Sequence, residues 1–142
     1  MGSSNAGLIH SAVLAALEAA SDIYTVEDWP ADSKVWLAQF TGTDDRMPAL
    51  HVSWKESFKP YTTDGDVEES DAYTITGAFR FSGSTRGEYV RLRDIVLAAL
   101  NADWTFGGLA DMSNPAECEL GEQQGDVQQF TISFTLSHIW TP

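Results

Sequence analysis

The sequence has 142 residues, a length that predicts a single domain over residues 1–142. Its apolar content of 43% excludes global disorder, and its net charge of −13 excludes a protein that wraps nucleic acid, because such binding depends on cationic contacts. A single cysteine, Cys118, excludes an internal disulfide and suits a reducing compartment. No apolar run approaches the roughly 20 residues of a membrane span, and the start lacks a signal-peptide pattern, so we expect no membrane partner.

The N-terminal third predicts a helix followed by an irregular segment and a strand. Over residues 4–20, apolar residues recur at three- and four-residue spacings. They are Leu8, Ile9, Ala12, Val13, Ala16 and Leu17. Residues 23–34 contain a Trp-Pro step and turn residues, so we expect them to be irregular. Residues 35–40 are apolar on both alternating faces, which predicts a short central strand.

Two further strands flank an acidic segment. Alternation over residues 50–58 predicts the first of them, and alternation over 73–81 predicts the second. Between them, residues 59–72 are rich in carboxylates and turn formers, so we expect a loop or a long hairpin tip. Gly77 lies inside the second strand, where an isolated glycine indicates a bulge or a close approach of another chain segment.

The C-terminal half predicts a second helix and a terminal hairpin. Thr85 and Glu88 have the spacing of a capping box, and an apolar stripe then continues to about residue 101. Residues 102–117 are expected to hold a short strand and a loop, and 117–120 another strand. Residues 127–142 alternate so regularly that they predict a long strand with one apolar face.

These elements predict the fold class. Two amphipathic helices and a set of amphipathic strands joined by short connections indicate an α+β domain. We expect two layers, with a mostly antiparallel sheet and both helices packed on one of its faces.

The sequence contains no catalytic motif, and its nearest approach to a metal-binding motif is a poor match to a calcium loop at residues 64–69. A solvated acidic loop is expected there, and a weak contact with a divalent cation or a basic partner is the alternative. His10, His51 and His138 alternate with apolar neighbours and have no second ligand at a recognisable spacing, so structural or solvent-facing roles are expected. Cys118 has no partner cysteine in a CxxC motif. We therefore predict a protein that is not an enzyme, with no catalytic residue, no metal and no cofactor.

The pattern of elements resembles the tail terminator proteins of long-tailed, siphovirus-like bacteriophages. The resemblance lies in the N-terminal helix around Leu8–Leu17, the proline-led strand Met47–Val52 and the acidic segment that runs into a strand at Glu69–Phe79. The helix at 86–101 and the alternating terminal strand complete it. The resemblance spans nearly the whole chain, and it lies in architecture rather than in a diagnostic motif.

What the resemblance implies is a structural virion protein without catalysis. Members of the family form a homohexameric ring that caps the tail tube, ends tube polymerisation and joins the tail to the head-side connector protein. DNA passes only in transit through the lumen. The expected location is the neck of the virion, with the host cytoplasm during assembly. The alternatives are another neck component, such as a head–tail connector or tail-completion protein, or a small ligand-binding α+β domain.

A heterologous ring needs two different faces on each subunit, and the chain offers residues for both. The acidic candidates for a subunit interface or the lumen are Asp64, Asp66, Glu68 and Glu69, and the basic candidates for the interface are Arg86, Arg91 and Arg93. Trp and Tyr dominate protein interfaces. The aromatic candidates for interface anchors beside the acidic segment are Trp54, Phe58 and Tyr61.

Overall fold

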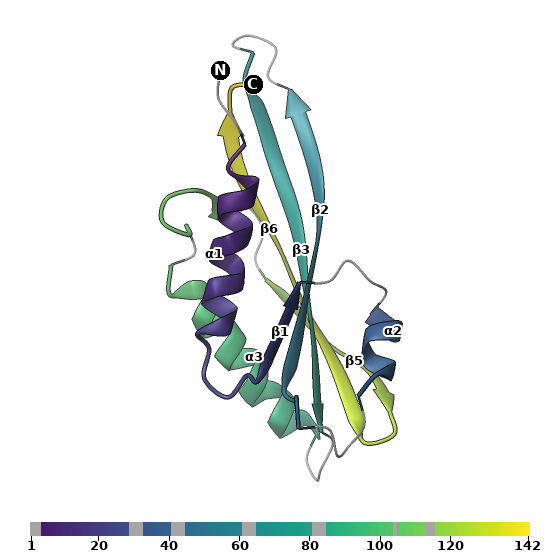
Figure 1. Cartoon of the computed structure of the whole chain (residues 1–142). Helices are drawn as coiled ribbons and strands as arrows, with labels where there is room; N and C mark the ends of the chain where they lie inside the picture. The colour runs from purple at the N-terminus through teal and green to yellow at the C-terminus, as the bar shows by residue number, and fades with distance from the viewer. Residues whose placement is uncertain are drawn as a thin grey trace.

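The computed structural model of the chain describes residues 4–28, 33–40, 45–60, 65–80, 85–103, 105–112 and 116–142. Three helices and six strands are present in these residues (Figure 1). In chain order they are α1 (Ala6–Glu18), β1 (Thr25–Asp28), α2 (Ser33–Ala38), β2 (Ala49–Pro60), β3 (Val67–Arg80), α3 (Thr85–Asn101), β4 (Asp111–Met112), β5 (Glu117–Gln124) and β6 (Val127–Trp140).

All the described strands join one sheet. Its order is β1-β2-β3-β6-β4, and β5 also pairs with β6. The pair β1–β2 is parallel and the other pairs are antiparallel. The prediction of an α+β fold with a mostly antiparallel sheet is therefore confirmed.

The long strands β2, β3 and β6 form the centre of the sheet, and their registers place the apolar residues of each strand in the same rows. Val52, Ile75 and Ile132 are one such row, and all three are fully buried. Along β6, the apolar residues from Phe130 to Leu136 are buried and the residues between them are partly exposed. The predicted terminal strand is thus confirmed, with its apolar side facing the core.

The helices α1 and α3 contribute to the same core as this sheet face. Ile9, Val13 and Leu17 of α1 are fully buried, each four residues from the next. Leu92 and Val96 of α3 belong to the same cluster. Both predicted helices are confirmed, but the predicted stripe of α1 was too wide. Leu8 is 61% exposed, because it lies one residue to the side of the buried row.

The predicted strand at 35–40 is wrong, because these residues belong to the helix α2 and the turn after it. Trp36, Leu37 and Phe40 are buried, and a spacing of one and four residues fits a helix as well as a run of apolar residues fits a strand. They pack in a second cluster with Ala49 and Ala78, which lie on the opposite sheet face from Leu50 and Phe79. Figure 1 shows α2 across the sheet from α1.

The segment predicted to be irregular, 23–34, contains the edge strand β1. Residues 29–32 of that segment lie outside the described residues. Trp36 Nε1 donates a hydrogen bond of 2.9 Å to Glu27 Oε2, which ties α2 to β1. The prediction of two helices is accordingly corrected to three among the described residues.

The acidic segment is a hairpin of long strands rather than a loop. The strand β2 continues to Pro60, and β3 already begins at Val67. Of the expected loop, residues 61–64 lie outside the described residues. Residues 67–72 pair with both β2 and β6, so they are in the middle of the sheet and not at a mobile tip.

Between α3 and β6, the predicted short strand is β4 at Asp111–Met112, and Trp104 lies outside the described residues. The predicted strand at 117–120 is confirmed and extends to Gln124, with the turn to β6 at Gly125–Asp126. The Thr85 side chain of the predicted capping box is not described. Among the described helices, none is long and apolar enough to cross a bilayer.

Candidate functional site

A cluster of three buried ionisable side chains lies where the start of β3 meets the end of β6. Glu69 pairs with His138 across the two strands, and Asp71 is two residues further along β3. Because strand residues alternate between faces, Glu69 and Asp71 share a face with the core residues Tyr73 and Ile75. The fold therefore places these polar groups on the sheet face that carries the hydrophobic core.

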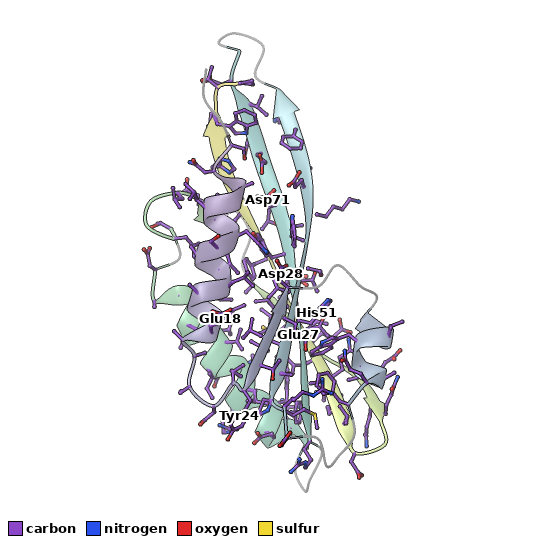
Figure 2. The ribbon with its side chains drawn as sticks, in the orientation of Figure 1. Glu18, Tyr24, Glu27, Asp28, His51 and Asp71 are labelled. Carbon is purple, nitrogen blue, oxygen red and sulfur yellow. The ribbon has the colours of Figure 1, made fainter. Side chains whose placement is uncertain are left out.

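The cluster is buried and compact. Glu69 and Asp71 are each 1% exposed and His138 is 7% exposed. One potential ligand atom from each residue lies within 4.8 Å of the others. Figure 2 shows Asp71 beside the first turns of α1, so the start of that helix covers the cluster.

The residues that precede α1 make the direct contacts. Ser4 Oγ donates a hydrogen bond of 2.6 Å to Glu69 Oε1 and accepts one of 3.0 Å from the Ala6 amide. The Asn5 amide donates a hydrogen bond of 3.1 Å to His138 Nε2. Since Nε2 accepts this bond, it carries no proton, and a neutral His138 holds its proton on Nδ1.

One atom of each residue in the cluster is left without a hydrogen bond. Glu69 Oε2, Asp71 Oδ1 and His138 Nδ1 are buried and have no hydrogen-bond partner within the described part of the chain. Burying a polar atom without a partner costs free energy. This cost is reduced when Asp71 holds a proton and donates a hydrogen bond to Glu69.

The surroundings of the cluster disfavour the ionised form of Asp71. Burial raises the pKa of Asp71 from 3.8 to about 7, together with the negative charge of Glu69, a hydrogen bond with Glu69 and the charge of Glu56. His138 Nε2 lies 4.0 Å from Glu69 Oε1. Near neutral pH the Asp71 carboxyl group is therefore only partly ionised.

A hollow in the surface leads to one side of the cluster. It has a volume of about 400 Å³, and its lining includes Asn5 and His138 together with Glu68, Ser137 and Ile139. The remaining lining residues come from 105–111. His138 thus has a route to solvent at the side that Asn5 covers.

The structure separates the acidic residues that were predicted to act together. Asp64 lies outside the described residues. Asp66 accepts a hydrogen bond from the Thr141 hydroxyl, and Glu68 is partly exposed at the start of β3. Glu69 is in the interior, which corrects its expected place in a surface loop. The cause is the alternation of β3, which points Glu68 and Glu69 to opposite faces.

The three arginines lie on α3, and two of them pair within the chain. Arg91 forms ion pairs of 2.7 Å with Glu88 and 3.0 Å with Asp22. Arg93 pairs with Asp94 at 2.9 Å, and Arg86 is exposed. Such exposed pairs contribute little to stability, so the arginines stay available to a second molecule.

Two of the three aromatic candidates, Trp54 and Phe58, are exposed. Trp54 is 40% exposed and lies 4.3 Å from the His10 ring, while Phe58 is 54% exposed near the end of β2. Tyr61 lies outside the described residues. His10 also pairs with Asp28 at 2.9 Å, so it has a structural role within the subunit.

Two residues of the buried cluster, Asp71 and His138, were not predicted as site residues. The sequence did contain a pattern that could have predicted their burial. Glu69 and Asp71 occupy the alternate positions that precede Tyr73 and Ile75, so all four residues lie on the same face of a strand. His138 continues the alternation of β6 in the same way. Comparison with known proteins adds no assignment, because the sequence matches no protein-family model and no curated protein.

Proposed function

We propose that the chain is a tail-terminator-like structural protein that forms a homohexameric ring on the tail tube of a long-tailed phage. The observation that carries the proposal is that the acidic and the basic candidate residues lie toward opposite ends of β3. Asp66 and Glu68 lie at the hairpin end of β3, and the arginines lie on α3, which follows the opposite end of that strand (Figure 1). In this proposal α1 and α3 form the second layer over one face of the sheet, as the resemblance implies.

This arrangement of charges suits a ring in which one surface of each subunit contacts a different surface of its neighbour. A closed ring uses two different surfaces of each subunit, and opposite charges on them favour the correct register. The hairpin end also exposes apolar groups that a neighbour could cover, because Phe58 is 54% exposed and Ile139 is 58% exposed. Carboxylates that remain in the lumen would repel the phosphates of DNA in transit.

The first test is the mass of the protein in solution, measured by light scattering over a range of concentrations, alone and with the tube protein of the same particle. We expect a species of about six times the 15.5 kDa of one chain, at least in the presence of the tube. A chain that stays monomeric under both conditions contradicts the ring.

The second test is a charge reversal on α3. We expect Arg91→Glu together with Arg93→Glu to weaken ring formation by at least about tenfold, because like charges then face each other at the contact. Reversal of Asp66 and Glu68 to lysine in the same chain should restore the ring. The measurement is the oligomer fraction by analytical ultracentrifugation.

The matched control for this pair is Asp22→Asn. It removes the ion pair of Arg91 within the subunit and keeps the arginine charge. The φ of Asp22 is +65°, a conformation that asparagine also tolerates, so the backbone is not disturbed. We expect this variant to form the ring normally. If the double reversal also leaves the ring and the tail length unchanged, the arginines are not in the contact.

Tail length separates the terminator from the other neck components. A terminator added to polymerising tube protein should stop growth and bind the head-side end of the tube. A head–tail connector should bind without limiting length. Electron microscopy of tubes assembled with and without the protein measures both the length and the place of binding.

A further inference from the structure

We propose that Glu69, Asp71 and His138 bind one divalent transition-metal ion, with Zn²⁺ as the best match to the donors. This inference is independent of the ring, since it depends only on the interior of one subunit. It gives a role to three side chains that the proposed function does not use.

The first argument is the burial and the spacing of the three side chains, each of which also has an unpartnered atom. The three residues are at least nine-tenths buried, and each has an atom without a hydrogen bond in the described part of the chain. Their potential ligand atoms lie within 4.8 Å of one another. Ligand atoms in a tetrahedral zinc site are about 3.3 Å apart, so rotations that move each side chain by about 1 Å would close the site.

The second argument is charge. Two carboxyl groups share a buried place with an imidazole, and buried charges normally require a partner. The basic group that the described residues place nearest to Glu69 is His138 itself, with Nε2 at 4.0 Å from Oε1. A divalent cation would balance both carboxylates, satisfy the free oxygens and use an imidazole nitrogen.

The donor set favours zinc over the alkaline-earth ions. Calcium takes six to eight oxygen ligands, and magnesium prefers an octahedron of oxygens with several waters. An imidazole ligand suits zinc and its neighbours in the transition series, and zinc also accepts carboxylate ligands. Three protein ligands would leave a fourth position, which the Ser4 hydroxyl or a water from the adjoining hollow could fill.

Metal binding would also displace the start of α1. If the metal binds Nε2, that atom can no longer accept the hydrogen bond from the Asn5 amide. If it binds Nδ1, a neutral ring must carry its proton on Nε2, which again cannot accept that bond. Either way Asn5 must find another acceptor, and the hollow beside it can supply water.

The test uses the untagged full chain after treatment with a chelator. We expect isothermal titration with ZnCl₂ to show one site per chain with micromolar or tighter affinity, and CaCl₂ and MgCl₂ to bind much more weakly. In amide NMR spectra, zinc should shift the signal of Asn5. Absence of zinc binding, or equal binding of calcium, would overturn the assignment.

Variants separate this site from adventitious binding. Asp71→Asn and His138→Gln should each weaken zinc binding by about 100-fold or more, because each removes a ligand. The matched control is His10→Gln, which removes a more exposed histidine paired with a carboxylate, Asp28. Its zinc affinity should equal that of the original chain. If His10→Gln weakens binding and Asp71→Asn does not, the buried cluster is not the site.

Discussion

Replacing Gly77 by alanine is expected to lower the free energy of unfolding by about 3 kcal/mol, because the added methyl group overpacks the core. A Cβ at this position would lie 2.1 Å from Phe130 Cε1 and 2.2 Å from Phe130 Cζ. The two residues face each other across β3 and β6. A clash this close cannot be relieved without moving the ring.

The Phe130 ring has little freedom to move. It is 1% exposed, and its neighbours include the rings of Phe79 at 6.0 Å and Tyr89 at 5.7 Å between centroids. A displaced Phe130 would therefore disturb the contact between the sheet and α3. The methyl group would weaken the packing of several residues rather than one.

Urea denaturation measures the effect, and two other glycines are controls. Gly7 lies in α1 with nothing within 4 Å of an added Cβ, so Gly7→Ala should raise the free energy of unfolding by about 1 kcal/mol through helix propensity. At Gly121 an added Cβ would make an ordinary contact of 3.5 Å, so Gly121→Ala should change stability little. A Gly77→Ala variant as stable as the original chain would show that Phe130 adapts freely.

The close approach at Gly77 was one of two interpretations of the sequence, and the structure selects it. The registers of β2, β3 and β6 run through this position without a shift, so there is no bulge. The long strand at the C-terminus and the helix α3 were also predictable, because a pattern repeated over many residues leaves few alternatives. The Ala-rich α1 was predictable for the same reason.

The secondary structure of segments that are short, or apolar on both faces, could not be predicted from such a pattern. Residues 35–40 are too few to show a helical period, and only contact with Ala49 and Ala78 decides which of their faces is buried. The edge strand β1 has four residues, and its pairing with β2 comes from tertiary structure. Local sequence contains neither kind of information.

The buried cluster was missed for a different reason. Carboxylates are mostly exposed, so the composition of 59–72 indicated a loop. The structure shows that Glu69 and Asp71 follow the alternation of β3, and that they are buried because β6 and the start of α1 cover them. The pairing of Glu69 with His138 joins positions far apart in the chain, which no local pattern could reveal.

Replacing Asp71 by asparagine is expected to stabilise the metal-free chain at pH 8 by about 2 to 4 kcal/mol. The pKa of Asp71 is raised from 3.8 to about 7, chiefly by burial and by the charge of Glu69. A difference of one between the folded and unfolded pKa values of a group corresponds to about 1.4 kcal/mol. Asparagine has nearly the same shape and carries no charge to bury.

The raised pKa of Asp71 also sets the direction of the pH dependence. Between pH 4 and pH 7 the folded chain holds a proton on Asp71 that the unfolded chain has lost. Unfolding then releases a proton, so a rise in pH favours the unfolded state. The contribution of Asp71 to stability is greatest below pH 4 and falls as the pH rises through about 7. The ionisable groups around it are Glu69, His138, Glu56 and the neighbouring Tyr73.

Comparing variants isolates this contribution from the other carboxylates of the chain. Urea denaturation in EDTA from pH 4 to pH 8 should show a loss of stability with pH that is smaller in Asp71→Asn. The control Asp126→Asn removes an exposed carboxylate in the turn between β5 and β6, and its profile should follow that of the original chain. If the stability profiles of all three chains coincide, Asp71 ionises at its ordinary pKa, and other groups already balance its buried charge. If only Asp71→Asn differs, the interior of the subunit holds an uncompensated carboxylate near neutral pH.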